Sequence, residues 1–189
     1  MEALLTSIFL VAVSEIGDKT QLLSFVLAAR LRKPWPIIGG ILLATIVNHS
    51  LAGWIGTLLA GWMAPSTLAW IVGLSFVGFG FWALHPDSLE ESPRLHRGSA
   101  FVTAFVAFFF AEIGDKTQFA TIALAARFDS LVIVVIGTTI GMMLADVPAV
   151  WLGEKLAHRI PMKAVRIVAA TLFVVVGVIT LWGAWGGSR

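Results

Sequence analysis

The chain has 189 residues, of which 58% are hydrophobic and only 13% are charged, a composition typical of a membrane-embedded protein rather than a soluble domain. The absence of cysteine excludes disulfides and thiolate sites for zinc, copper or iron–sulfur clusters. The net charge of +2 comes from basic residues in short gaps between apolar runs, which argues against nucleic-acid binding.

Six apolar runs have about the length that a helix needs to cross a hydrocarbon core, roughly 20 residues for about 30 Å. In chain order we expect membrane helices at 3–29, 37–61, 68–84, 100–126, 131–152 and 165–185. The first run carries Glu15 and Asp18 and lacks the basic start of a cleaved signal peptide, so we expect it to be retained. The predicted fold class is all-α integral membrane, with six transmembrane helices.

The second half of the chain repeats the first with an offset of 97 residues. The heptad Glu-Ile-Gly-Asp-Lys-Thr-Gln occurs at 15–21 and again at 112–118. We therefore predict a first three-helix repeat at 1–84, a cytoplasmic linker at 85–98 and a second three-helix repeat at 99–189. Because three spans is an odd number, the second repeat enters the membrane in the opposite direction, an architecture typical of secondary transporters.

Basic residues are distributed unequally between the two sides of the predicted membrane. Of the eleven lysines and arginines outside the two heptads, Arg127 and Arg189 fall on one side and the other nine fall on the opposite side. This bias places the first, third and fifth connections in the cytoplasm and both termini in the periplasm. The residues on the cytoplasmic side are Arg30, Arg32, Lys33, Arg94, Arg97, Lys155, Arg159, Lys163 and Arg166.

Both heptads lie near the middle of their runs, where a charge is costly unless it is paired or solvated. In a continuous helix Glu15 and Asp18 would share a face, and Lys19, four residues after Glu15, could pair with it. Gly17 allows either close packing or a break in the helix, and the length of the first run fits either tilt or interruption.

Together the two heptads hold four carboxylates and two ammonium groups, a formal sum of −2 that one divalent cation would balance. Oxygen ligands of this kind suit manganese, calcium or magnesium. Without a metal, the crowded carboxylates are expected to take up protons, as an antiporter requires. The predicted cation ligands are Glu15, Asp18, Gln21, Glu112, Asp115 and Gln118. Secondary candidates for the motifs or the proton path are Ser14, Lys19, Thr20, Asn48, His49, Lys116, Thr117 and Asp146.

Two of the secondary candidates lie at equivalent positions of the repeat, His49 in the second run and Asp146 in the fifth. An intramembrane carboxylate such as Asp146 is expensive unless it faces the site or a water path. His49 could relay protons, and a hydrogen-bonded structural histidine is the alternative.

The sequence features also bear on functions other than cation exchange. Polar contacts between helices would explain the motifs structurally, but a serine or asparagine would do the same at lower desolvation cost. The Gly-x-Gly pattern of intramembrane aspartyl proteases is absent, because Glu15 and Glu112 stand two residues before the motif glycines, and we expect no enzymatic activity. A LysE-like exporter of a small amino acid or organic cation, and a passive divalent-cation channel, stay open as alternatives.

The doubled heptad resembles the cation/proton exchanger family whose signature is Glu-x-Gly-Asp-(Lys or Arg)-(Thr or Ser), which includes Golgi Gdt-type manganese and calcium transporters and bacterial MneA-type manganese exporters. The resemblance covers essentially the whole chain. It implies that the four motif acids bind the cation, and that the chain exports Mn²⁺ across the bacterial inner membrane, with Ca²⁺ as the alternative and H⁺ as the counter-ion. We expect no resident cofactor; the expected partners are the divalent cation, protons and the lipid bilayer, and the oligomeric state stays open.

Overall fold

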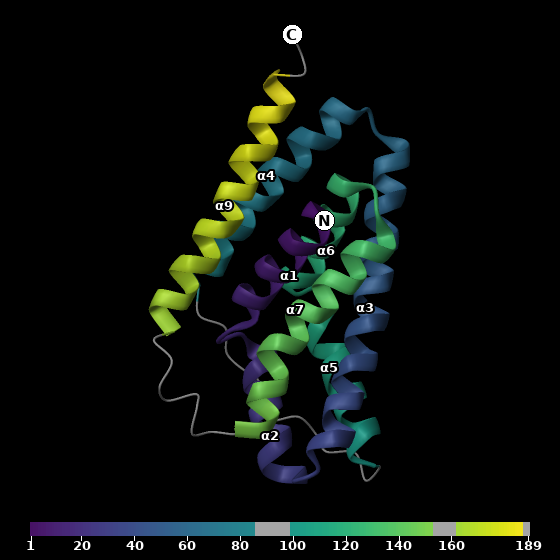
Figure 1. Ribbon diagram of the computed structural model, residues 1–189, viewed down its shortest axis with the longest axis vertical. Coiled ribbons are helices and arrows are strands. Elements are labelled where there is room, and N and C mark those ends of the chain that lie inside the picture. The colour runs from purple at the N-terminus through teal and green to yellow at the C-terminus, as the bar shows by residue number, and fades with distance from the viewer. Residues whose placement is uncertain (86–98, 153–161, 187–189) are drawn as a thin grey trace.

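The computed structural model describes residues 1–85, 99–152 and 162–186, and over these ranges the chain forms eight helices and no strand (Figure 1). The all-α expectation is therefore confirmed for the described residues. Most of the predicted linker, 86–98, lies outside them, as do Arg94, Arg97, Lys155, Arg159 and Arg189. The helices are α1 (Glu2–Glu15), α2 (Lys19–Leu31), α3 (Pro34–Trp62), α4 (Pro65–Ala83), α5 (Ala100–Glu112), α6 (Lys116–Phe128), α7 (Leu131–Leu152) and α9 (Met162–Gly186).

Four long helices correspond to the predicted runs at 37–61, 68–84, 131–152 and 165–185. These are α3, α4, α7 and α9, and within the described ranges they are the four that are long and apolar enough to cross a membrane. Pro34 and Pro65 open α3 and α4, where a residue without an N–H group does not disturb helical hydrogen bonding.

The two runs that carry the heptads are each interrupted. The run at 3–29 forms α1 and α2, and the run at 100–126 forms α5 and α6. A helix of 13 or 14 residues rises only about 20 Å, less than the roughly 30 Å of a hydrocarbon core, so neither half is long enough alone. Of the two explanations for the length of the first run, the structure shows interruption.

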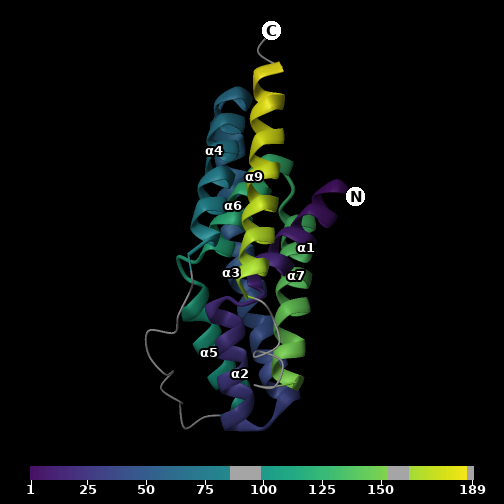
Figure 2. The ribbon, with the colours of Figure 1, turned by 90° about the vertical axis from the view of Figure 1, so that its left-hand side faces the viewer.

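Each helix that leads into a heptad packs against a long helix from the other half of the chain. In Figures 1 and 2, α1 lies along α7 and α5 lies along α3. Glycines allow these close approaches, because a Cβ atom added at Gly40 would lie 2.5 Å from the carbonyl oxygen of Phe101, and one added at Gly137 would lie 2.9 Å from that of Leu4. The two contacts join residues at equivalent positions of the sequence repeat.

Helices α4 and α9 form a separate pair along one side of the molecule (Figures 1 and 2). Gly73 and Gly177 let their backbones approach, and Phe76 stacks on Phe173 with ring centroids 6.3 Å apart. The pair meets the rest of the bundle mainly through α6, which packs on α4, and α1, which packs on α9.

The interior of the bundle contains acidic side chains beside its apolar core, and many large apolar side chains lie on its surface. Glu15, Glu112 and Asp146 are fully buried, whereas Trp62 is 80% exposed and Phe110 is 67% exposed. Water would favour the reverse arrangement, and the hydrocarbon of a bilayer favours this one. Together with the four long apolar helices, the pattern indicates a membrane protein.

Candidate cation-binding site

The first heptad forms a tight loop between α1 and α2. Helix α1 ends at Glu15, Ile16 is extended, and Gly17 has a φ of 81°, a left-handed conformation that glycine adopts without strain. The Gly17 N–H donates to the side-chain oxygen of Gln21 at 2.8 Å, and Asp18 then caps the start of α2. The loop therefore places one carboxylate at the end of α1 and another at the beginning of α2.

The second heptad folds in the same way between α5 and α6. Helix α5 ends at Glu112, Gly114 has a φ of 74°, and Asp115 caps α6. The Gly114 N–H donates to the side-chain oxygen of Gln118 at 2.9 Å. In both loops the aspartate N–H donates to the glutamate carbonyl oxygen at 3.1 Å, so the two heptads share one local structure.

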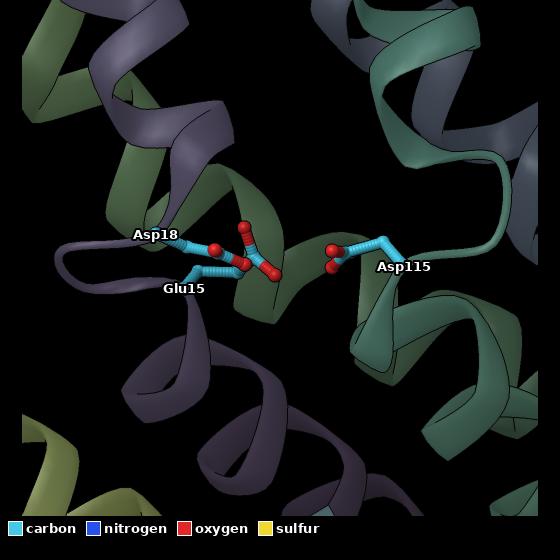
Figure 3. Close-up of side chains that lie close together, drawn as sticks. All are labelled: Glu15, Asp18 and Asp115. Atoms are coloured by element: carbon cyan, nitrogen blue, oxygen red, sulfur yellow. The ribbon is translucent and has the colours of Figure 1, made fainter. Parts of the chain in front are cut away.

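Three carboxylates from the two loops converge in the interior. Glu15, Asp18 and Asp115 each offer an oxygen atom, and these atoms lie within 4.8 Å of one another. Figure 3 shows the three side chains pointing toward a common centre, with Asp115 approaching from the opposite loop. All three residues are at most 2% exposed. A compact set of hard oxygen atoms from two broken helices is a suitable site for a divalent cation.

The motif lysines pair across the two loops and not within them. Lys19 Nζ lies 3.0 Å from Asp115 Oδ1, and Lys116 Nζ lies 2.9 Å from Asp18 Oδ1. The expected pairing of Lys19 with Glu15 is wrong, because the chain between them is not helical and the spacing of four residues no longer brings them together. The ion pairs therefore bind the two halves of the chain to each other.

The motif threonines donate to the glutamates. Thr20 Oγ1 donates to Glu15 Oε2 at 2.5 Å, and Thr117 Oγ1 donates to Glu112 Oε2 at 3.3 Å and to Asp115 Oδ2 at 3.1 Å. The second oxygen of each glutamate, Oε1, is buried and has no protein hydrogen-bond partner. Because an unsatisfied buried oxygen is costly, these two atoms are positions for a cation, a proton or water.

Two predicted ligands already use their side-chain oxygens locally. The amide oxygens of Gln21 and Gln118 accept from the backbone of Gly17 and Gly114, as described above. Gln21 also donates through Nε2 to the Ala145 carbonyl oxygen at 3.2 Å, which ties α2 to α7. A ligand role for the two glutamines, and for Glu112 beyond its link to Asp115 through Thr117, stays a prediction.

Asp146 lies on α7 and is fully buried beside α2. Its Oδ1 atom accepts from Ser24 Oγ at 2.8 Å, and its Oδ2 atom has no protein partner. Ser24 was not among the predicted site residues, although it stands three residues after Gln21 and therefore on the same helix face. Ser14, which was selected, donates within its own helix to the Val11 carbonyl oxygen at 3.0 Å.

Asn48 and His49 lie on α3 and are also buried. Asn48 Nδ2 donates to the Phe109 carbonyl oxygen at 3.1 Å, which ties α3 to α5 one turn before Glu112. Neither ring nitrogen of His49 has a protein hydrogen-bond partner. Neither residue belongs to the cluster of three carboxylates, and their part in a proton path stays a prediction.

The two heptad loops differ in how closely the neighbouring helices cover them. Asp18 and Lys116 line a small cavity whose other wall includes Ala83 of α4 and Arg166 of α9. In the second loop Ile113 is 51% exposed, and the side chain of Lys19, which pairs with Asp115 of that loop, is 27% exposed. The α4–α9 pair therefore covers the first loop more closely than the second.

A family model described as "Divalent cation/proton antiporter GDT1" matches residues 3–91 and again residues 100–188. The two matches correspond to the two halves of the chain, each with one heptad.

Among curated proteins, the chain is 48% identical to a "Putative manganese exporter" of Vibrio cholerae, over 95% of this chain and 90% of the relative. It is 30% identical to a GDT1-like protein of Synechocystis, over 96% and 98% of the two chains. It is 29% identical to GDT1-like protein 5 of Arabidopsis thaliana, over 93% of each. No solved structure matches the chain.

Proposed function

Because this chain belongs to the GDT1 family of divalent cation/proton antiporters, we propose that it exchanges Mn²⁺ for protons at the carboxylate cluster of Glu15, Asp18 and Asp115. The observation that carries the proposal is the convergence of these three buried carboxylates from both heptads. The family is one of transporters, which agrees with the expectation that the chain is not an enzyme.

The charges around the cluster fit a divalent cation and protons as alternative occupants. The four motif acids and two motif lysines sum to −2, which one divalent cation balances. When the cation leaves, two protons restore the same balance, and the buried Oε1 atoms of Glu15 and Glu112 are acceptors without another partner. Mutually exclusive occupancy of one site is what couples the two fluxes.

The broken helices suit this exchange. The carbonyl groups of the last turns of α1 and α5 lack helical partners, and the N-termini of α2 and α6 carry positive dipole ends. Half-helices that meet at mid-membrane are a recurring way to bind ions in transporters. In the proposed topology, α1–α2 and α5–α6 each cross the membrane once, because two halves of 13 or 14 residues give about 40 Å of helix.

The proposed topology has six crossings in two inverted repeats, within 1–84 and 99–189. The equivalent contacts of Gly40 with Phe101 and of Gly137 with Leu4 support a repeat of structure as well as of sequence. The bias of basic residues supports periplasmic termini, and the bacterial relative supports placement in the inner membrane.

The choice of Mn²⁺ over Ca²⁺ is supported by the name of the Vibrio cholerae relative and by the resemblance to bacterial manganese exporters. Oxygen ligands alone accept either ion, so Ca²⁺ is the alternative substrate.

The test is transport by the purified chain in liposomes with an imposed pH gradient. An interior more acidic than the exterior should drive Mn²⁺ inward, and a protonophore should abolish the accumulation. Parallel assays with Ca²⁺ rank the two metals. Failure of a pH gradient to move either metal would contradict the proposal. Metal flux without proton counterflow would favour a channel, and movement of a basic amino acid would favour a LysE-like exporter.

A matched pair of variants in α1 distinguishes a specific loss of cation exchange from a general effect of substitution in this helix. Glu15→Gln removes a buried carboxylate of the cluster and should abolish exchange. Glu2→Gln removes a carboxylate of the same helix whose side chain is 74% exposed, and it should leave exchange near the wild-type rate.

A further inference from the structure

Two ion pairs place a lysine ammonium on an aspartate of the opposite heptad, Lys19 on Asp115 and Lys116 on Asp18. Both aspartates belong to the carboxylate cluster. A divalent cation in the cluster would bind their oxygens at about 2.0–2.6 Å. It would therefore compete with the ammonium groups for the same lone pairs and would repel them.

The two lysines differ in exposure although their heptads are identical. The Lys19 side chain is 27% exposed, and the Lys116 side chain is 5% exposed. Lysine carries its charge on a flexible four-carbon stem. Lys19 can thus move its ammonium group into a more solvated position without losing its charge, whereas the Lys116 side chain is more deeply buried.

The two ion pairs also differ in what surrounds them. A Cβ atom added at Gly114, next to Asp115, would meet nothing within 4 Å, and the neighbouring Ile113 is 51% exposed. The cavity beside Asp18 is lined by both Lys116 and Arg166, so a cation that approached there would face two cationic side chains. The side of Lys19 is therefore the electrostatically easier approach.

We propose that Lys19 is the displaceable counter-ion of this site: its ammonium group neutralises Asp115 while no metal is bound, and an entering divalent cation takes its place while Lys116 stays on Asp18. Counting only the three carboxylates of the cluster, and so without Glu112, displacement leaves one ammonium beside them and a net charge of −2 that the cation balances. Lys19 acts as a positioning residue, since it moves and forms no bond to the metal. The inference rests on the proposed function in requiring that the cation bind this cluster.

The first test is equilibrium binding of Mn²⁺ to the purified protein at constant pH. Lys19→Gln removes the competitor and should tighten binding by about tenfold, a typical size for coupling between two ligands. Lys19→Arg keeps the charge and should tighten binding less than Lys19→Gln does. The matched variant Lys116→Gln should bind no tighter than the wild type.

In transport, Lys19→Gln should lower both KM and kcat, because a cation without its competitor is held more tightly and released more slowly. Unchanged or weaker binding by Lys19→Gln, with a wild type that binds and transports Mn²⁺, would overturn this inference alone. A wild type that neither binds nor transports a divalent cation would overturn the proposed function with it.

A second test uses the wild-type chain and so does not depend on how a variant folds. An amine-reactive reagent is applied in detergent with and without saturating Mn²⁺, and modification is measured for each lysine by peptide mass spectrometry. Mn²⁺ should accelerate modification of Lys19 and leave that of Lys116 and of the exposed Lys33 unchanged. Protection of Lys19, or an unchanged rate, would overturn the inference.

Discussion

The two heptads have the same seven residues and the same loop geometry, yet their surroundings differ. The α4–α9 pair covers the loop at Gly17, and the loop at Gly114 is more open. At the repeat-equivalent positions of the long helices, α3 carries His49 and α7 carries Asp146. A duplicated sequence therefore determines the local conformation of each loop, while the neighbouring helices determine how solvated and how charged it is.

The largest effect is expected at the carboxylates that the two loops contribute equally. Asp18→Asn and Asp115→Asn should each reduce proton-driven Mn²⁺ transport in liposomes to background, because each removes an oxygen charge from the cluster. Asp18→Asn should also lower the unfolding temperature more, since it removes the negative charge beside the buried Lys116. Transport by either variant at the wild-type rate would remove that aspartate from the site.

The next largest effect is expected where the two halves of the chain pack together. Gly40→Ala and Gly137→Ala each force a Cβ atom against backbone or side-chain atoms of the partner helix, which should cost about 1–3 kcal/mol of stability. The control is Gly78→Ala in α4, where an added Cβ meets nothing within 4 Å and helix propensity improves. Equal unfolding temperatures for the three variants would contradict the packing described for these glycines.

A smaller effect on Mn²⁺ transport is expected at Asp146 and His49, which occupy equivalent positions of the repeat and should differ in importance. Asp146→Asn removes a buried charge bonded to Ser24 of α2, and we expect it to reduce Mn²⁺ transport by about tenfold, or about 1.4 kcal/mol. His49→Gln changes a side chain without a protein hydrogen-bond partner, and it should reduce transport by only about twofold. The reverse ranking would show that the α3 side of the site carries the more important group.

An effect on stability alone is expected from backbone strain in the open loop. Gly114→Ala introduces a Cβ atom that meets nothing, so only the positive φ of 74° is penalised, by about 1–2 kcal/mol. Gly114→Asn should cost less, because asparagine tolerates this conformation better. Thermal unfolding of the two variants measures the difference, and the absence of any loss in Gly114→Ala would mean that the loop can adopt another conformation.

Hydrophobic length was sufficient to predict most of the fold. The run at 131–152 matches α7, and the other long helices differ from their predicted bounds by a few residues. The break at Gly17 was one of two explanations that the sequence allowed, since length alone does not distinguish a tilted helix from a broken one. The packing of α4 against α9 was not predicted, because an apolar helix in a membrane shows little periodicity to reveal its neighbours.

The convergence of three motif carboxylates could be predicted from the sequence, but the ion pairs around them could not. Both heptads indicated which carboxylates to expect, and three of them converge in the structure. The partner of Lys19 was assigned incorrectly, because spacing along a chain predicts contacts only within a continuous helix. The contact of Ser24 with Asp146 joins residues 122 positions apart, a separation at which a single sequence contains no signal.

The crossed ion pairs also have a consequence for biogenesis. Asp18 meets Lys116 only after about 100 further residues have been synthesised, so the first loop enters the bilayer before its partner exists. Until then its charges must be stabilised by water, lipid headgroups or the insertion machinery. Because each motif lysine pairs with the aspartate of the other heptad, neither half of the chain can complete its ion pairs alone. The two pairs therefore form late in assembly, and only when both halves are correctly placed.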